Sequence, residues 1–232
     1  MNKYPKGSEW RIWDLHVQTP YSANYSGCWD DFKKQISSSK AAAIGVNDYF
    51  SVEGYKNLKK EIDSGSFDPQ GKQFFPVVEM RMTESVQKRS PKNSATHFNF
   101  HLIFNNDNDA LNINDIEAFI KSLSSNGSII GSDYDDPEKR MEMKVSFEQV
   151  ISSLKNDNTF TGNYLIWIHF DDYGGVDAIA PNYDAWIKRG LLKNPQLLRS
   201  HPKKQHACLL WTYAKPHKTK PTYTQKQSEP CS

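Results

Sequence analysis

Short apolar runs alternate along the chain with segments in which apolar residues recur every three or four positions. The runs have strand composition and end in polar residues, whereas the periodic segments are amphipathic and predict helices. Strands alternating with helices in this way predict an α/β fold with a largely parallel sheet. We expect strands over residues 10–16, 41–46, 74–80, 98–104 and 164–170, and helices beginning near Asp30 or Asp31, at Ser51, and over 113–123, 147–154 and 176–188.

The pattern ends near Leu198. Residues 199–232 are rich in Pro, Lys and Thr and show no periodicity, so they predict a tail that is disordered or foreign to the fold. From Leu191 onward eight Lys and Arg stand against one acid, although the whole chain carries a net charge of +2. The length allows one sizeable core. The expected organisation is therefore one domain over 1–198 and a basic tail over 199–232.

Composition limits the class of protein. The charged fraction of 24% is ordinary, and no apolar run approaches the ~18 residues of a membrane helix. The N-terminus does not resemble a signal peptide. Cys28, Cys208 and Cys231 lie far apart, and their odd number argues against a disulfide framework. We expect a cytoplasmic protein that does not bind a membrane.

Polar residues occupy one face of the first predicted strand. Asp14, His16 and Gln18 alternate with apolar residues, so their side chains are expected to point the same way. Burying such groups is costly unless they are paired or bound to something. One interpretation is a metal site at the C-terminal end of the strand. The other is an edge strand whose polar face meets water.

Later strands also end near residues that can bind a metal. The C-terminal ends of parallel strands lie on one side of a sheet or barrel, where active sites gather. Three imidazoles and two carboxylates from such ends would suit Zn²⁺, Mn²⁺ or Fe²⁺. Each also has a structural explanation on its own, such as a turn residue before a helix or a hydrogen-bonded core histidine. The five residues are His16, Asp48, Glu79, His101 and His169.

The same positions carry a resemblance to a known family. Residues 14–19 (Asp-Leu-His-Val-Gln-Thr), 44–49 (Ile-Gly-Val-Asn-Asp-Tyr) and 75–79 (Phe-Pro-Val-Val-Glu) resemble the first three motifs of PHP domains, the polymerase and histidinol phosphatase superfamily. Residues 99–103 and 165–169 resemble the two later strands of the family that each carry a histidine, here His101 and His169. The sequences of residues 7–10 (Gly-Ser-Glu-Trp), 48–55 (Asp-Tyr-Phe-Ser-Val-Glu-Gly-Tyr) and 101–105 (His-Leu-Ile-Phe-Asn) are similar to those of the N-terminal domain of TrlF-like proteins. Those carry an SMC- or AAA-type ATPase after the PHP domain and are associated with bacterial defence against phage.

This resemblance implies a distorted (β/α)7 barrel, incomplete at its C-terminus, with two or three divalent metals (Zn, Mn or Fe) at the strand ends. It implies hydrolysis of phosphoester bonds, with nucleic acid among the substrates. Glu79 and Asp48 are the implied catalytic residues. The implied metal positions are His16, Gln18, Asp48, Glu79, His101 and His169.

The sequence departs from the PHP pattern in two places. Gln18 stands where a second histidine is expected, and a neutral amide binds transition metals poorly. The late Asp-x-His motif is not found, and neither is a Walker-type ATPase loop. A truncated chain is the simplest explanation. The alternatives left open are a metal-dependent phosphoesterase, an inactive remnant that acts as a binding module or pseudogene product, and a tail that binds single-stranded nucleic acid.

Overall fold

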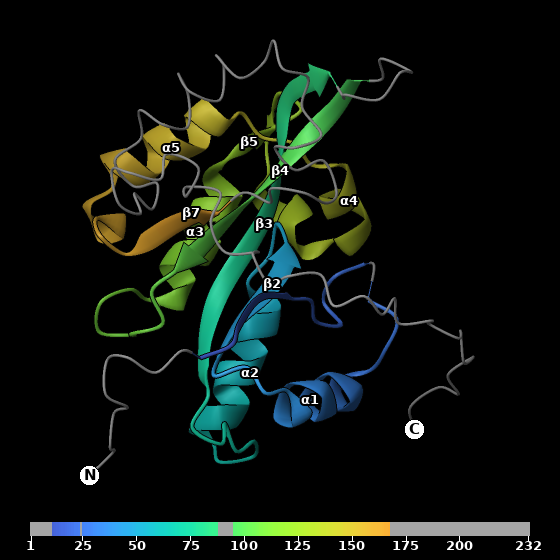
Figure 1. Cartoon of the computed structure of the whole chain (residues 1–232). Coiled ribbons are helices and arrows are strands. Elements are labelled where there is room, and N and C mark those ends of the chain that lie inside the picture. The colour runs from blue at the N-terminus through green and yellow to red at the C-terminus, as the bar shows by residue number, and fades with distance from the viewer. Residues whose placement is uncertain (1–10, 24, 88–94, 168–232) are drawn as a thin grey trace, which may run out of the picture.

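The computed structural model describes residues 11–23, 25–87 and 95–167. Five strands form a mixed sheet in the order β1-β2-β3-β4-β7 (Figure 1). The first two pairings are parallel and the last two antiparallel. The bounds are β1 (Trp13–Val17), β2 (Ala43–Tyr49), β3 (Gln73–Gln87), β4 (Ala95–Phe104) and β7 (Tyr164–Trp167).

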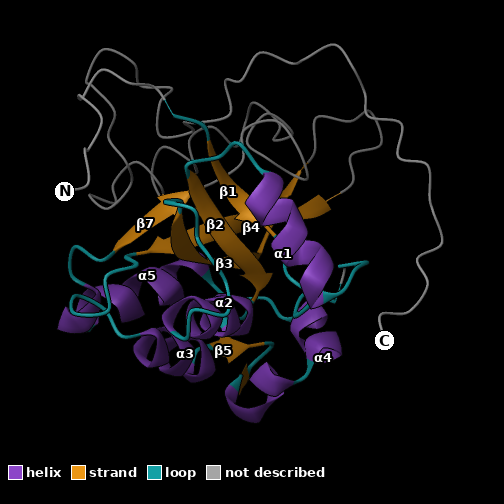
Figure 2. Ribbon diagram, turned by 90° about the horizontal axis from the view of Figure 1, so that it is seen from below, coloured by secondary structure: helices purple, strands orange, loops and turns teal. Residues whose placement is uncertain are grey.

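Helices cover one face of this sheet. Figure 2 shows α2, α3 and α5 side by side below the strands. No helix of the described ranges is long and apolar enough to cross a lipid bilayer. The remaining elements are α1 (Trp29–Ser38), α2 (Glu53–Asp63), α3 (Ile113–Ser122), α4 (Pro137–Glu142), α5 (Phe147–Asn156), the 3₁₀ helices η1 (Gly131–Asp135) and η2 (Asn158–Phe160), and the pair β5 (Ser124–Ser125) and β6 (Ser128–Ile129).

The two faces of the sheet carry different side chains because successive residues of a strand point to opposite sides. On the helix-covered face, Val78 and Met80 of β3 belong to the main core together with residues of α3 and α5. On the other face a smaller cluster is formed by Val77, Ile103 and Trp167. Glu79 and His101 follow the alternation of this second face. The strands therefore present a carboxylate and an imidazole on the side away from the helices.

The predicted barrel is wrong. The described strands form an open sheet with β1 and β7 at its two edges. The reason lies after β3, where only residues 88–94 separate it from β4. A parallel return requires a crossover of about a dozen residues or more, so the chain reverses and the two strands pair antiparallel. The architecture is a mixed α/β fold.

Local structure follows the sequence pattern more closely. The predicted helix starts are near the observed ones, although α1 begins at Trp29 with Asp31 accepting from the backbone of Cys28. Residues 83–87 lie outside the predicted strands but continue β3, where β4 pairs with Ser85, Val86 and Gln87. The predicted helix over 176–188 and the tail over 199–232 lie outside the described residues.

Candidate metal centre

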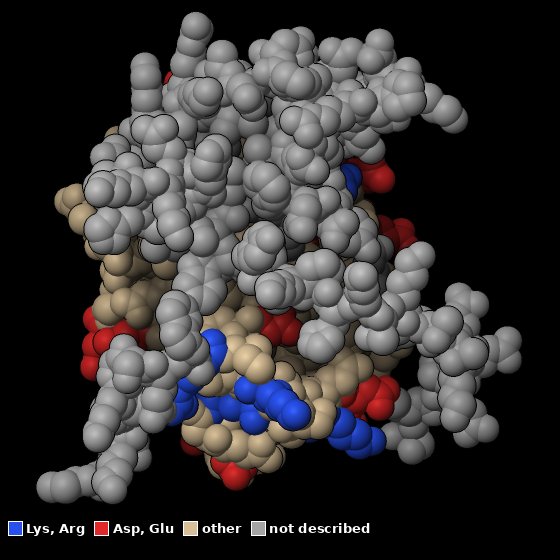
Figure 3. All heavy atoms as spheres, in the orientation of Figure 1, with Lys and Arg blue, Asp and Glu red and all other residues tan. Residues whose placement is uncertain are grey.

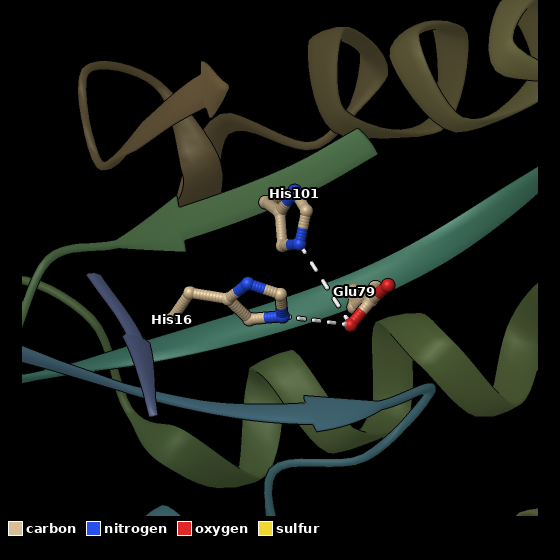
Figure 4. Close-up of side chains that lie close together, drawn as sticks. All are labelled: His16, Glu79 and His101. Atoms are coloured by element: carbon tan, nitrogen blue, oxygen red, sulfur yellow. Dashed lines mark hydrogen bonds and ion pairs between the residues drawn. The ribbon is translucent and has the colours of Figure 1, made fainter. Parts of the chain in front are cut away.

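Three predicted metal ligands meet on the sheet face away from the helices. His16 comes from β1, Glu79 from β3 and His101 from β4 (Figure 4). Glu79 Oε2 lies 3.2 Å from His16 Nε2 and 3.8 Å from His101 Nε2. The candidate ligand atoms of the three residues all lie within 4.8 Å of one another. Residues separated by as many as 85 positions in the chain thus form one compact group, because 101 − 16 = 85.

Strand register brings these side chains together. Glu79 and His101 are direct partners in the antiparallel β3–β4 pair, so they project side by side from one face. His16 reaches them from β1, across β2. A side chain at Gly45 of β2 would collide with β1, because an added Cβ would lie 2.6 Å from the carbonyl oxygen of Leu15. The absence of a side chain at Gly45 therefore lets β1 lie close enough for His16 to reach Glu79.

Burial increases from His16 to His101. The His16 side chain is 30% exposed, whereas Glu79 is 11% exposed and His101 is fully buried. Trp167 of β7 lies against both imidazoles, with ring centroids 4.7 Å from His101 and 6.2 Å from His16. This indole was not among the predicted site residues. Its position on an apolar strand, two residues before His169, carries no signal beyond ordinary core packing.

The protonation states suit metal binding. Burial alone would raise the pKa of the Glu79 carboxyl, but hydrogen bonding and charge from His101 and His16 outweigh burial and lower it below 4.5. Burial lowers the pKa of the His101 imidazole below 6.5, against the opposing effect of Glu79. At neutral pH the group therefore holds an anionic carboxylate and a neutral buried imidazole. These are the forms in which both side chains bind metals.

The buried imidazole predicts a pH-dependent stability of the metal-free protein. Because the folded pKa of His101 is lowered, the unfolded chain takes up a proton at this residue below pH 6.5 while the folded chain resists it. The free energy of unfolding is expected to fall as the pH drops below 6.5, by up to about 1.4 kcal/mol per pH unit from this residue. Urea unfolding in the presence of a chelator measures the slope.

The same measurement on His101→Gln provides the check. The lowered pKa of Glu79 has its effect at more acid pH, because its contribution is complete above 4.5 and is lost only below that value. Above the pH range in which Glu79 acts, His101→Gln should therefore flatten the slope. An unchanged slope in His101→Gln would contradict the assignment.

Two asparagines hold the Glu79 carboxylate in place. Asn47 Nδ2 donates to Glu79 Oε2 over 3.1 Å, and Asn99 Nδ2 donates to Oε1 over 2.8 Å. Asn99 Oδ1 in turn accepts from Arg81 Nε at 3.2 Å. Sequence reasoning missed both asparagines. Asn99 could have been found by strand alternation, since it stands two residues before His101 and so shares its face.

Asp48 lies outside the cluster, on the helix-covered side of β2. Its carboxylate accepts hydrogen bonds from the backbone and hydroxyl of Thr19 and from the hydroxyl of Ser22, at 2.7–3.1 Å. Burial raises the pKa of this carboxyl, although the hydrogen bonds and the charge of Arg140 act in the opposite direction. The residue predicted to bind metal therefore anchors the loop that follows β1.

A buried arginine also anchors this loop. Arg140 of α4 is 4% exposed and donates to the carbonyl oxygen of Tyr21 at 2.7 Å. On α2, Gly54 leaves room for the anchor, since an added Cβ would overlap Asp48 Oδ2 and Thr19 Oγ1. The loop directly after β1 is thus held by groups from two different elements, the Asp48 carboxylate of β2 and the Arg140 guanidinium of α4.

The other residues singled out in the sequence do not belong to the cluster in the described part of the chain. The expected alternation of Asp14, His16 and Gln18 is interrupted, because the β1–β2 register shifts between Asp14 and Val17. Asp14 is exposed and accepts a hydrogen bond from the backbone of His16. Gln18 follows the end of β1 and is half-buried. His169 lies outside the described residues.

A separate open pocket of about 550 Å³ lies between α2 and the start of α3. It is lined by Lys56, Lys59 and Lys60 but by none of the clustered ligands. Lys56 pairs with Glu117 of α3, and Lys59 pairs with Asp63 at the C-terminal end of α2. This pocket therefore has walls of mixed charge and is separate from the group of His16, Glu79 and His101 in its lining residues.

Within the described residues, His16, Glu79 and His101 form a group of two imidazoles and one carboxylate that could hold a metal ion. Comparisons with family models, with curated proteins and with solved structures gave no match to the chain.

Proposed function

We propose that this chain is a metal-dependent hydrolase of phosphoesters with its centre at His16, Glu79 and His101. The observation that carries the proposal is the meeting of two imidazoles and a carboxylate from three strands. Two histidines and one glutamate are the protein ligands of several catalytic zinc sites, and two histidines with one carboxylate also hold non-haem iron. The choice of a phosphoester substrate rests on the resemblance of the motifs to PHP domains.

The residues fit a divalent cation. Glu79 offers an anionic oxygen and His101 a neutral nitrogen, each on a strand held by the sheet. A divalent cation bound there would act as a Lewis acid that activates water and neutralises charge on the phosphoryl group. Glu79 and His101 would hold the cation from the buried side. His16, the most exposed of the three, marks the side from which a substrate would enter.

The distribution of charge on the surface guides the choice of the first substrate to test. On the face drawn in Figure 3, Lys and Arg side chains gather at the lower end, with Asp and Glu side chains beside them. Cations of the described residues are often paired with acids, as Lys33 is with Asp30 and Glu61 and Lys56 is with Glu117. Binding of a long polyanion depends on neutralising many phosphates. Nucleic acid and an associated ATPase remain proposals from the resemblance, and a small phosphoester is the direct test.

The test is hydrolysis by protein that has been stripped of metal and reloaded. Mn²⁺- or Zn²⁺-loaded protein is expected to hydrolyse bis(p-nitrophenyl) phosphate or p-nitrophenyl phosphate, and chelator-treated protein is expected to be inactive. Bound metal is measured in the same samples by elemental analysis. Stoichiometric metal without turnover on either ester would contradict phosphoester hydrolysis, and failure to retain any metal would remove the basis of the proposal.

The rival function is a metal-free remnant that serves as a binding module. It is favoured by the position of Asp48, whose carboxylate is taken up by Thr19 and Ser22 and does not face the cluster. Of the five implied positions that the structure describes, three form the cluster, and His169 lies outside the described residues. The same elemental analysis separates the two functions, because a remnant of this kind would bind neither Mn²⁺ nor Zn²⁺ at this position.

A further inference from the structure

Asn47 carries a buried oxygen without a hydrogen-bond partner. The residue is fully buried on β2, and its Nδ2 donates to Glu79 Oε2 over 3.1 Å. Within residues 11–23, 25–87 and 95–167, no group donates to its Oδ1. A buried carbonyl oxygen without a donor costs free energy unless a water, an ion or a ligand satisfies it. This oxygen belongs to the amide that contacts the central carboxylate of the metal cluster.

The orientation of this amide follows from the charge of Glu79. Turning the amide over would point Oδ1 at Glu79 Oε2, and two acceptors would then face each other. Donation from Nδ2 therefore keeps Oδ1 available for another partner. Asn99 provides the comparison, because it also donates to Glu79 but its own Oδ1 accepts from Arg81. Two asparagines thus flank one carboxylate, and only Asn47 retains an unsatisfied oxygen.

We propose that Asn47 Oδ1 is a further ligand of the cation held by His16, Glu79 and His101. This assignment rests on the metal centre proposed above and adds a donor that the predicted set did not contain. An amide oxygen binds Zn²⁺ poorly, as noted for Gln18, but it is a hard, neutral donor of the kind that Mg²⁺, Ca²⁺ and Mn²⁺ accept, whereas imidazole also suits Zn²⁺. A set of two nitrogens and two oxygens therefore shifts the preference of the site toward Mn²⁺ relative to Zn²⁺.

The matched variants Asn47→Leu and Asn99→Leu test the assignment. Each removes one donor to Glu79, but only Asn47→Leu also removes the unsatisfied oxygen. Calorimetric titration of metal-free protein with Mn²⁺ and Zn²⁺ gives both affinities. Asn47→Leu is expected to weaken Mn²⁺ binding by about 10- to 100-fold and to lower the ratio of Mn²⁺ to Zn²⁺ affinity. Asn99→Leu is expected to weaken both metals alike, which leaves the ratio unchanged.

A second pair keeps the test decisive if a leucine variant does not fold, as judged by circular dichroism. Asn47→Asp and Asn99→Asp both place a carboxylate beside Glu79, but only the first offers a charged oxygen at the proposed ligand position. The Mn²⁺ to Zn²⁺ affinity ratio should rise in Asn47→Asp and remain unchanged in Asn99→Asp.

Equal ratios within both pairs would overturn the assignment of Asn47 while leaving the metal centre intact. A wild-type protein that binds neither metal would overturn the centre and the assignment together. The two failures are therefore distinguished by the wild-type titration alone.

Discussion

Replacing Glu79 by Gln is expected to reduce the affinity for a divalent metal by more than about 100-fold and to abolish metal-dependent turnover. The substitution keeps the shape of the side chain but removes the anionic charge beside His16 and His101. A neutral amide cannot replace the carboxylate as the charged ligand of this group. Calorimetric titration with Mn²⁺ and Zn²⁺ measures the first effect, and hydrolysis of a chromogenic phosphoester measures the second.

The matched control is Glu117→Gln on α3. Glu117 is also a partly buried, ion-paired glutamate, but its partners are Lys56 and Lys121 in the helical layer. This variant should retain wild-type metal affinity and turnover. If Glu79→Gln bound metal as tightly as Glu117→Gln, the negative charge of Glu79 would not be needed for metal binding. The cluster would then not be a metal centre.

Introducing a single methyl group at Gly45 is expected to damage both stability and metal binding. In Gly45→Ala the new Cβ would lie 2.6 Å from the carbonyl oxygen and 2.7 Å from Cα of Leu15. These are backbone atoms of β1, so a side-chain rotation cannot relieve the overlap. We expect a loss of about 3 kcal/mol in the free energy of unfolding, at the upper end for overpacking. Displacement of β1 also moves His16 away from Glu79.

Gly127→Ala is the control for this prediction. Gly127 has a positive φ of 87° and no heavy atom within 4 Å of an added Cβ, so the variant is destabilised by about 1 kcal/mol through backbone strain alone. Its metal affinity should equal that of the wild type, whereas Gly45→Ala should bind Mn²⁺ at least about tenfold more weakly. Wild-type metal affinity in a folded Gly45→Ala protein would show that β1 need not approach β2 so closely.

The motif over residues 44–49 was located correctly, but Asp48 within it holds the loop after β1 instead of facing Glu79. The motif indicated that polar groups follow the apolar residues of β2, and two such groups are Asn47 and Asp48. Because side chains alternate along a strand, only one of the two can face Glu79. Both faces of β2 are buried, so hydrophobic periodicity gave no basis for choosing between them. Packing of Val46 into the helix-side core assigns Asp48 to that side and Asn47 to the cluster.

Local properties of the sequence were sufficient to place most strands and helix starts approximately and to single out all three clustered residues. Apolar runs and helical spacing depend on near neighbours, and His16, Glu79 and His101 stand within or close to apolar runs that could be identified as strands. The direction of β4, the interrupted alternation of β1 and the partners of Glu79 depended on tertiary structure. The short link after β3 determines only which way β4 can run. The approach of β1 to Gly45 and the register of β3 with its neighbours are contacts between residues far apart in the chain.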